Sequence, residues 1–428
     1  MNQKPRFKIV TLGCRTNQYE SQAYHDQLSA LGYVSAEGDE VADVCIVNTC
    51  TVTESADKGS RQEIKQLAKR NPGSRLVVTG CFAERQPDLI RQMEGVTDVI
   101  SNKDKENLLK IVYPEEEWPE FSIQHFEAHT RAFVKVQDGC NSYCTYCIIP
   151  YVRGRSRSRS KDEILREIEG LIAQGYKEIV LTGINIGDFD GGVQEGETPV
   201  RLADLIRAVD PMPGLHRLRV SSIDPDEVDD NLADAILNGK RTCPSMHIVL
   251  QSGSNVILKR MNRKYTRQIF TDTVERLKAA NPDFSFTTDV IVGFPGETDV
   301  DHQETLDIMR QVRFAKVHMF PFSARPRTRA AIMPNQVPQE IIQERKQEVL
   351  RLAEQESYNL RSSYVGRTME ILTESRDASS GRIGGHTSNF LQVWIDDSSL
   401  IPNQLVKIKC VENQANGLLG IYDANSDR

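Results

Sequence analysis

The chain has 428 residues, which is enough for two or three domains. A hydrophobic fraction of 39% and a charged fraction of 26% indicate a globular protein, and no run of about 18 apolar residues predicts a membrane span. The net charge of -7 argues against a protein that coats nucleic acid with its whole surface. The opening residues lack the apolar segment of a signal peptide, so we expect a cytoplasmic protein with reduced thiols.

Short apolar runs alternate with helical patterns in the first part of the chain. The apolar runs cover residues 7–12, 44–48, 75–79 and 96–101, and amphipathic stretches cover 18–31 and 55–69. This alternation is typical of a parallel sheet flanked by helices. We therefore predict an N-terminal α/β domain over residues 5–115, which leads into an acidic, proline-containing linker at 113–121.

A second series of strands and helices begins near Ala132. Strand-like runs occur at 132–137, 178–184, 217–223, 246–251, 287–294 and 316–322, and helical patterns lie between them at 161–174, 200–209, 226–238, 266–280 and 298–312. Six strands joined by helical crossovers predict a barrel, in complete or partial form. We assign residues 126–356 to this central domain.

The pattern changes after a connecting helix that we expect at 338–360. Strand-like runs at 367–375, 390–396, 403–412 and 418–423 are separated by polar turns, with no helical period between them. This pattern predicts a small all-β barrel over residues 359–425. The expected fold class is thus α/β, with a parallel sheet, a partial (β/α)6 barrel and a terminal β-barrel in that order.

Three cysteines of the N-terminal part occupy the same local context. Cys14, Cys50 and Cys81 each come directly after an apolar run and before a helical stretch. The carboxyl ends of parallel strands meet at one edge of a sheet, so these thiols are expected to converge on a shared metal site. The alternative is three ordinary buried cysteines. Three other cysteines, Cys45, Cys243 and Cys410, do not follow this pattern, and we expect them to be ordinary core or incidental residues.

The stretch "GCNSYCTYC" places Cys140, Cys144 and Cys147 in a C-x3-C-x2-C pattern. Structural zinc sites have four ligands, and no second cysteine pair or suitably spaced histidine follows. An iron–sulfur cubane held by three thiolates keeps one iron open, where a substrate can bind and be reduced. The competing interpretation is a non-catalytic RNA-binding protein whose cysteines hold zinc or a structural cluster.

Basic residues gather in three short segments of this acidic chain. They lie at 151–161, 259–264 and 325–329, and the first segment contains four arginines and one lysine without any acid. Each segment alone is compatible with an ordinary solvated loop. Three of them together favour a localised phosphate-binding surface.

The C-x3-C-x2-C motif at the start of a six-stranded α/β series resembles the radical S-adenosylmethionine superfamily. With three further cysteines in an N-terminal domain and a β domain at the end, residues 5–425 resemble the methylthiotransferase family, whose terminal domain is the RNA-binding TRAM barrel. The stretches at 11–21, 48–62 and 221–228 are most similar to the branch that modifies threonylcarbamoyladenosine in tRNA. Other branches act on isopentenyladenosine in tRNA or on a ribosomal-protein aspartate.

The resemblance implies a set of cofactors. Cys140, Cys144 and Cys147 would hold a 4Fe-4S cluster that cleaves S-adenosyl-L-methionine to a radical, and Cys14, Cys50 and Cys81 would hold an auxiliary 4Fe-4S cluster that carries the transferred sulfur. The product would carry a methylthio group at C2 of N6-threonylcarbamoyladenosine at tRNA position 37, next to the anticodon. A flavodoxin or ferredoxin would donate electrons, and we expect a monomer.

The same resemblance suggests contacts to S-adenosyl-L-methionine. Tyr146, one residue before the last cysteine of the motif, matches the aromatic residue that meets the adenine. Gly183, Asn185 and Gln251 lie at the ends of expected strands, where backbone and amide groups approach a small ligand. Gly293 belongs to a glycine–proline turn after a further strand.

Contacts to the tRNA anticodon stem-loop are expected from the basic segments. Arg153, Arg155 and Arg157 follow the cysteine loop closely, so we expect them at the mouth of the active site, together with Arg325. The target adenosine would be turned out of a single-stranded loop into the barrel. Arg327 stands where the family usually has glycine.

Overall fold

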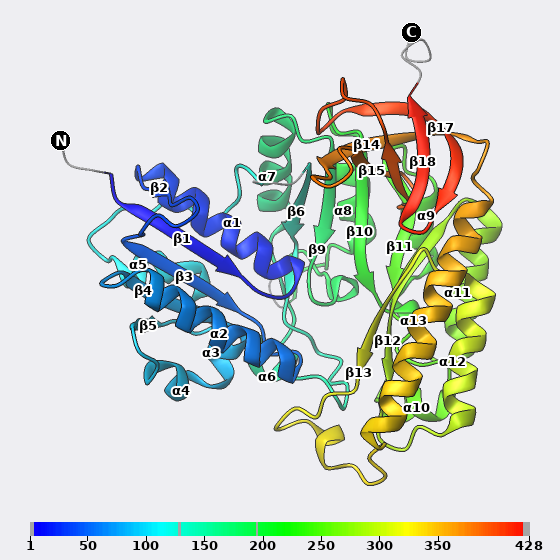
Figure 1. The fold of residues 1–428 in the computed structure, drawn as a ribbon, viewed down its shortest axis with the longest axis horizontal. Helices are drawn as coiled ribbons and strands as arrows, with labels where there is room; N and C mark the ends of the chain where they lie inside the picture. The colour runs from blue at the N-terminus through cyan, green and yellow to red at the C-terminus, as the bar shows by residue number, and fades with distance from the viewer. Residues whose placement is uncertain (1–3, 127–129, 194–195, 423–428) are drawn as a thin grey trace.

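The computed structural model describes residues 4–126, 130–193 and 196–422, and three large sheets follow one another along this chain, besides a two-stranded ribbon (Figure 1). The first is a five-stranded parallel sheet, the second a six-stranded parallel sheet, and the third a closed five-stranded barrel. Within the described residues, no helix has the length and apolar character needed to cross a membrane.

The N-terminal sheet has the strand order β2-β1-β3-β4-β5, and all its strand pairs are parallel. All six residues of the central strand β3 are buried because helices cover both faces. Helix α1 and the short α5 pack on one face, and α2, α3 and α4 pack on the other. The elements are β1 (Arg6–Thr11), α1 (Arg15–Ala30), β2 (Val34–Ser35), β3 (Val44–Thr49), α2 (Glu54–Arg70), β4 (Arg75–Gly80), α3 (Cys81–Arg85), α4 (Pro87–Arg91), β5 (Val96–Val99) and α5 (Leu108–Val112).

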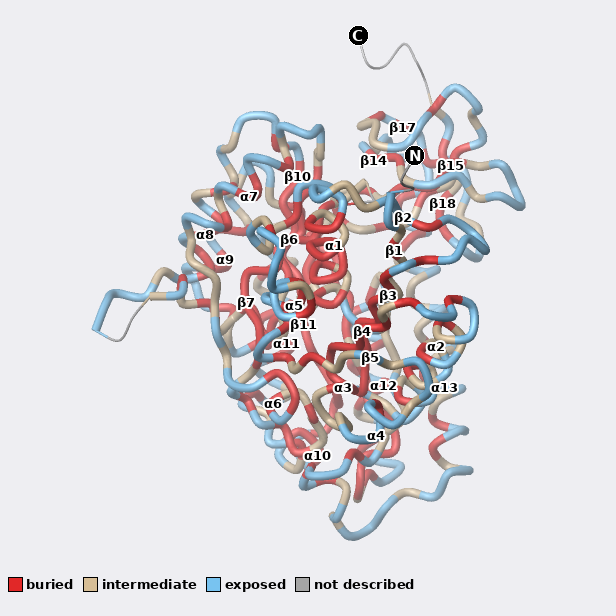
Figure 2. The backbone as a smooth tube through the Cα atoms, turned by 90° about the vertical axis from the view of Figure 1, so that its left-hand side faces the viewer, coloured by how far each residue is buried: buried red, intermediate tan, exposed pale blue. Residues whose placement is uncertain are grey.

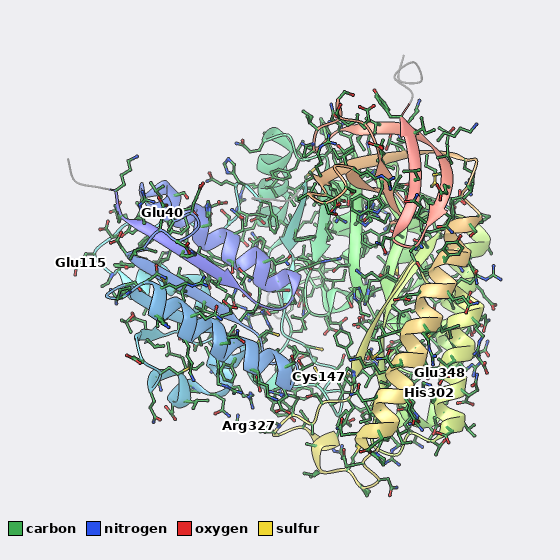
Figure 3. The ribbon with its side chains drawn as sticks, in the orientation of Figure 1. Glu40, Glu115, Cys147, His302, Arg327 and Glu348 are labelled. Carbon is green, nitrogen blue, oxygen red and sulfur yellow. The ribbon has the colours of Figure 1, made fainter. Side chains whose placement is uncertain are left out.

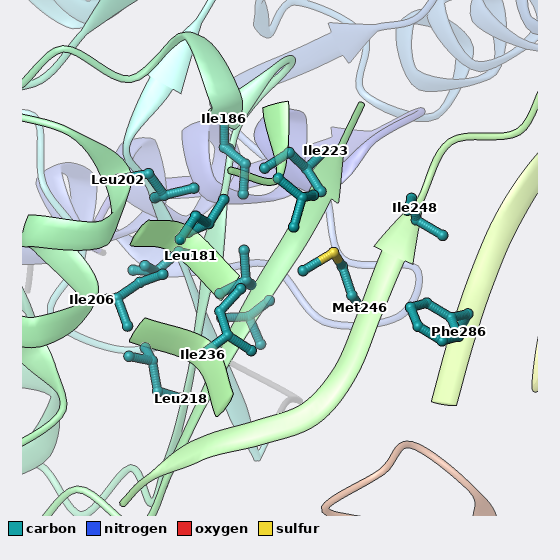
Figure 4. Packing of buried hydrophobic residues seen from close by; sticks show 14 of the residues in the cluster. Leu181, Ile186, Leu202, Ile206, Leu218, Ile223, Ile236, Met246, Ile248 and Phe286 are labelled. Carbon is teal, nitrogen blue, oxygen red and sulfur yellow. The ribbon is translucent and has the colours of Figure 1, made fainter. Parts of the chain in front are cut away.

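The central sheet has the order β13-β12-β11-β10-β9-β6, so it is an open half-barrel whose edges are β6 and β13. Figure 4 shows the apolar layer between this sheet and its helices, where Leu181 and Leu218 meet Ile206 and Ile236. The strands are β6 (Arg131–Lys135), β9 (Glu178–Thr182), β10 (Arg217–Ile223), β11 (Thr242–Ile248), β12 (Ser285–Val292) and β13 (Lys316–Pro321). The helices between them are α6 (Ile149–Val152), α7 (Lys161–Ala173), α8 (Leu202–Val209), α9 (Asp230–Leu237), α10 (Asn255–Arg260), α11 (Arg267–Ala280) and α12 (Asp299–Val312).

The fourth strand of this domain, β11, ends earlier than its sequence suggests. We expected a strand at 246–251, but β11 stops at Ile248 and Gln251 makes only an isolated bridge to Val290. Gln251 adopts a φ of 60°, a left-handed conformation that an extended strand does not contain. The chain therefore turns at Gln251 and directs the following loop toward the carboxyl edge of the sheet.

The C-terminal barrel follows the long helix α13 (Gln339–Ser362), and its strands are β14 (Thr368–Arg376), β15 (Ile383–Thr387), β16 (Gln392–Ile395), β17 (Leu405–Gln414) and β18 (Gly417–Tyr422). It covers the amino ends of the central strands. Arg217, the first residue of β10, donates to the His386 carbonyl over 2.8 Å. Arg219 donates to the carbonyls of Thr387 and Ser388.

Helix α1 joins the N-terminal domain to the half-barrel, and Figure 2 shows it buried over much of its length. Tyr19 donates to Glu167 of α7 over 2.7 Å, and Arg159 donates to the Tyr19 hydroxyl over 2.9 Å. Tyr19 and Ala23 belong to the hydrophobic core of the central domain. This helix therefore fixes the orientation of the N-terminal sheet against β6.

The loop that contains Cys140 starts from a two-stranded ribbon made of β7 (Gln137–Asp138) and β8 (Arg157–Ser158). Gly139 lies in this turn with a φ of 72°, and a Cβ atom there would come 2.1 Å from the carbonyl oxygen of Arg155. Only glycine fits this close approach of two backbone segments. The ribbon thus brings the cysteine loop back over the carboxyl end of β6.

Gly139→Ala should lower the free energy of unfolding more than Gly154→Ala. Both residues have a positive φ, which costs an alanine about 1–2 kcal/mol. At Gly154 the nearest atom to an added Cβ is 3.9 Å away, so the clash is specific to Gly139. Urea unfolding of the two variants measures the difference, and equal losses would contradict this account of the ribbon.

Candidate functional site

Three parallel strands place Cys14, Cys50 and Cys81 at one edge of the N-terminal sheet. Cys50 directly follows β3, Cys81 directly follows β4, and Cys14 follows β1 at the start of α1. A Cβ atom on Gly13 would lie 2.8 Å from the Cys50 Cβ, so the first two cysteine loops touch. The sheet thus brings together the three thiols that lie far apart in the sequence.

The charges of these thiols interact with one another. Burial raises the pKa of Cys50 to about 11, and the neighbouring Cys81 and Cys14 contribute to the rise. Burial also raises the pKa of Cys81. Thiolates are the form that binds iron, and the positive charge of Arg153 opposes the rise in the pKa of Cys50 and Cys81 and so favours that form.

Cys140, Cys144 and Cys147 lie together in the loop after β7. The Cys147 amide donates to the Cys144 carbonyl over 2.9 Å, which closes a turn between these two residues. Burial raises the pKa of Cys147 strongly, and Cys144 and Cys140 contribute to the rise. Arg263 donates to the Cys144 sulfur over 2.8 Å and also pairs with Asp224.

Neither group of thiols forms a compact site for one ion. No three Cys, His, Asp or Glu side chains in the described ranges are placed to hold a single metal ion. Structural zinc needs four ligands around one centre. A 4Fe-4S cluster instead takes each thiolate on a different iron, so its ligands stand further apart. Each set offers three thiols, one fewer than a closed structural zinc site and the number that leaves one iron of a 4Fe-4S cluster open.

A cavity of about 160 Å³ lies between the two cysteine groups. Val52 and Thr53, just after Cys50, line one side, and residues 146–149, which include Cys147, line another. Figure 3 shows Cys147 in the loops near the lower ends of the two parallel sheets. The remaining wall comes from the half-barrel and consists of Gln251, Asp289, Ile291, Phe320, Pro321, Phe322 and Ser323.

Two of the expected cofactor contacts face this cavity. Tyr146 lines it and packs edge-to-face against Phe294, with 6.4 Å between ring centroids. Gln251 is 8% exposed, and its side-chain oxygen has no hydrogen-bond partner among the described residues. A buried acceptor of this kind indicates a ligand that donates a hydrogen bond.

Gly183, Asn185 and Gly293 are engaged by the protein itself. An added Cβ on Gly183 would meet Ile186 at 2.8 Å, and Asn185 donates to Glu227 over 2.8 Å. A Cβ on Gly293 would come 2.4 Å from Ile342 of α13. The need for glycine at position 293 is thus explained by the packing of α13 and not by the approach of a ligand.

The structure corrects the expected role of Arg153. Its side chain is fully buried, and it donates to Asp138 over 2.8 Å and to Glu20 over 3.1 Å. Lys105 pairs with the same two carboxylates. Arg153 therefore cannot meet an RNA phosphate; it neutralises buried acids where α1 meets the cysteine loop.

The structure corrects the expected role of Arg325 in the same way. Arg325 is 3% exposed and donates to Asp57 over 2.5 Å and to Thr51 over 3.1 Å. Arg85 pairs with Asp57 as well. Because Thr51 follows Cys50, Arg325 fastens the loop after β13 to the second cysteine loop and does not face solvent.

The remaining arginines of the basic segments reach the surface. Arg155 is exposed, and the side chain of Arg157 is 45% exposed although it also pairs with Asp138. Arg327 is exposed with a φ of 73°, and Figure 3 shows it in the same region of loops as Cys147. Glycine adopts this backbone conformation without strain, which explains why a glycine is suited to that position.

Sequence reasoning missed several polar residues around the site. Glu227 lies just beyond the carboxyl end of β10, and burial together with Asp224 raises its pKa to about 7. Its position just after an expected strand could have identified it as a candidate site residue. Arg263 gave no such signal, because Cys144, which it contacts, lies far away in the sequence. Asp289 gave none either, because its partner His247 belongs to no recognisable motif.

Comparisons with known proteins agree with this architecture. Residues 6–102 match the family described as Uncharacterized protein family UPF0004, and residues 134–309 match the Radical SAM superfamily. Among solved structures, the chain is similar to the radical S-adenosylmethionine methyltransferase TsrM from Kitasatospora setae, with a TM-score of 0.58, 14% identity and 77% of each chain covered. At this identity the likeness concerns the fold alone.

Curated relatives align over nearly the whole chain. The threonylcarbamoyladenosine tRNA methylthiotransferase MtaB of Chlamydia pneumoniae is 47% identical, with 97% of this chain and 98% of the relative covered. The protein of the same name from Bacillus subtilis is 36% identical over 94% and 93%. A tRNA-2-methylthio-N(6)-dimethylallyladenosine synthase from Carboxydothermus hydrogenoformans is 34% identical over 97% and 98%.

Arg153→Met should reduce the free energy of unfolding by about 3 kcal/mol, because it leaves the buried carboxylates of Glu20 and Asp138 short of positive charge. The exposed Arg155 provides the matched control, and Arg155→Met should change stability by less than about 0.5 kcal/mol. Urea unfolding of both proteins tests this. If Arg153→Met leaves the free energy of unfolding unchanged, the ion pairs of Arg153 with Glu20 and Asp138 do not hold the two domains together.

Proposed function

This chain belongs to the radical S-adenosylmethionine methylthiotransferase family, and we propose that it adds a methylthio group at C2 of N6-threonylcarbamoyladenosine at position 37 of tRNA. The observation that carries the proposal is the shared cavity: one wall follows Cys50 and another contains Cys147. Sulfur transfer to a C–H bond requires the sulfur-carrying group and the radical source to reach the same atom. A cavity between the two sets of thiols meets that requirement.

The residues present fit two 4Fe-4S clusters and S-adenosyl-L-methionine. Cys140, Cys144 and Cys147 would hold one cluster, and Cys14, Cys50 and Cys81 would hold the other. When bound, these groups supply the electron, the hydrogen abstraction at C2, the sulfur and the methyl group. Three thiols for each cluster leave one iron open for exchange.

The protein residues around the cavity position the reactants and exclude water. Ile148, Ile149, Ile291 and Phe322 give the cavity an apolar lining, which protects reactive species from solvent. Gln251 offers an unpaired oxygen to a donor on the ligand. Arg263 places a positive charge against Cys144 and is itself held by Asp224, so it stabilises an ionised thiolate there.

The threonylcarbamoyl substrate is favoured over the alternatives by similarity along the full chain. Relatives named for threonylcarbamoyladenosine reach 47% identity, whereas those named for dimethylallyladenosine reach 34–35%. A ribosomal-protein aspartate remains the other enzymatic alternative. A non-catalytic zinc protein is disfavoured, since each set of three cysteines lacks the fourth ligand of a structural zinc site.

Several partner assignments extend this proposal. The exposed Arg155 and Arg157 would contact phosphates of the anticodon stem-loop, together with the C-terminal barrel as a TRAM-like RNA-binding domain. A flavodoxin or ferredoxin would supply electrons to a monomeric enzyme in the cytoplasm. Nucleoside mass spectrometry of tRNA from a deletion strain tests the substrate. Loss of 2-methylthio-threonylcarbamoyladenosine is expected, and loss of the isopentenyl product instead would overturn the assignment.

Anaerobically reconstituted protein should contain about eight iron atoms per chain, as two 4Fe-4S clusters require. Cys81→Ala and Cys144→Ala should each lose about half of this iron, because each removes a ligand of one cluster only. Cys410→Ala is the matched control: Cys410 is buried in the C-terminal barrel and should leave the iron content unchanged. Equal iron in all variants would refute the ligand assignment.

Arg155→Ala should weaken binding of an anticodon stem-loop and reduce its salt dependence by about one unit in the slope of log K against log salt. The reason is the loss of one exposed charge that would displace a counterion from the RNA. Fluorescence anisotropy at several salt concentrations measures both quantities. An unchanged affinity together with an unchanged slope would show that Arg155 does not contact the RNA.

A further inference from the structure

Arg15 is an unusual cation in the interior of the half-barrel. It directly follows Cys14 and is the first residue of α1, yet its guanidinium lies over the ring of Phe133 in β6, 5.2 Å from the ring centroid. Within the described chain its guanidinium is neither hydrogen-bonded nor ion-paired. Burial lowers the pKa of Arg15 to about 10, and the charges of Arg131 and Arg219 add to this effect. The side chain nevertheless remains positive near neutral pH.

The other two arginines nearby already have acidic partners. Arg219 pairs with Glu178 over 2.6 Å, and Arg131 lies 3.3 Å from Glu374 and 3.9 Å from Glu178. The buried carboxylates are thus committed to these neighbours. Arg15 is partly buried and keeps a positive charge without a paired acid, so an anion that joined it there would be stabilised.

Arg15 lines a small chamber inside the half-barrel, about 30 Å³ in volume. Its lining includes Phe133, Arg219, Ser221 and Phe390, which come from β6, β10 and the C-terminal barrel. A space of this size holds about two water molecules or one carboxylate. The Ser221 hydroxyl is buried and has no hydrogen-bond partner among the described residues, so a donor for an anionic group lies in the same chamber.

The chamber and the cavity beside Cys147 are lined by side chains of the same strand, β12. Thr287 of β12 lines the chamber, and Asp289 and Ile291 of the same strand line the cavity beside Cys147. Alternate residues of a strand point to the same face, so these three side chains form one row. His247 bridges the two spaces, 2.9 Å from the Thr287 hydroxyl and 3.5 Å from the Asp289 carboxylate.

The far end of the chamber is covered by the C-terminal barrel. The guanidinium groups of Arg219 and Arg131 lie 5.1 and 5.6 Å from the ring centroid of Phe390. A group that extends from the cavity into the chamber would therefore stop against Phe390, next to Arg15.

We propose that Arg15 binds the carboxylate of the threonylcarbamoyl group and so determines which modified adenosine the enzyme accepts. This inference rests on the proposed function, since it assumes that the purine occupies the cavity between the cysteine groups. The N6 substituent then extends into the chamber, where Arg15 and the Ser221 hydroxyl meet its charged end. A dimethylallyl group carries no charge and would leave Arg15 unpaired, which disfavours that substrate.

Binding measurements with synthetic anticodon stem-loops test this role without relying on turnover. One RNA carries threonylcarbamoyladenosine at position 37 and the other carries adenosine. Wild-type protein should prefer the modified RNA, and Arg15→Met should reduce that preference by about 100-fold while affinity for the unmodified RNA stays the same. Arg15→Lys should restore much of the preference, and Arg351→Met, which removes an exposed arginine of α13, should leave it intact.

Iron content is measured for each variant, because Arg15 adjoins Cys14. A second comparison uses wild-type protein only and an RNA whose threonyl carboxylate is replaced by the neutral amide; the preference should fall to a similar extent. Retained preference for the modified RNA in Arg15→Met, or for the amide RNA in wild-type protein, would overturn the inference. An equal loss of affinity for both natural RNAs in Arg15→Met would also overturn it, since that result describes a general phosphate contact.

The proposed function and the role of Arg15 are refuted by different results. If wild-type protein converts isopentenyladenosine RNA and not threonylcarbamoyladenosine RNA, the proposed function itself is wrong. If wild-type protein converts threonylcarbamoyladenosine RNA and Arg15→Met binds it with undiminished preference, only the role of Arg15 is wrong.

Discussion

The site depends on the way the N-terminal sheet is fastened to the half-barrel by buried charges. On one side, Arg153 and Lys105 share the carboxylates of Glu20 and Asp138. On the other, Arg325 pairs with Asp57. Buried ion pairs contribute little net stability compared with apolar contacts, but they tolerate few geometries. Two such networks therefore fix the orientation in which the two cysteine edges face each other across one cavity.

Each of the three domains contributes a different part of the site. The N-terminal sheet and the half-barrel each contribute one set of thiols, and the C-terminal barrel covers the amino ends of the central strands, with Phe390 reaching into the interior. The site thus opens at the carboxyl ends of the strands, as in other open α/β sheets. Arg15 connects these parts, because it belongs to the N-terminal domain and reaches the interior of the half-barrel beneath the cavity.

Much of the fold follows from hydrophobic periodicity. The helices α7, α11 and α12 begin within one residue of their expected starts, where Ser160, Thr266 and Thr298 cap them. Strand β15 was missed because "IGGHT" contains two glycines. The structure explains the need for one of them, since a Cβ on Gly385 would come 2.4 Å from the Leu372 carbonyl oxygen.

The context of the six cysteines also follows from the sequence, since strand ends can be located from apolar runs. Arg153 and Arg325 were misassigned because a local run of arginines reveals nothing about burial. Their partners Glu20 and Asp57 lie more than 100 residues away, and Asp138 is the one partner near Arg153 in the sequence. The same limit hid the position of Arg15.

The central claim is that two three-thiol clusters face one cavity. Electron paramagnetic resonance of the fully reduced protein tests it most directly, because two paramagnetic clusters that share a cavity interact magnetically. The account predicts a spectrum broadened by this interaction, which becomes a simple single-cluster spectrum in Cys81→Ala. A wild-type spectrum equal to the sum of two independent clusters, or a spectrum from one cluster alone, would contradict it.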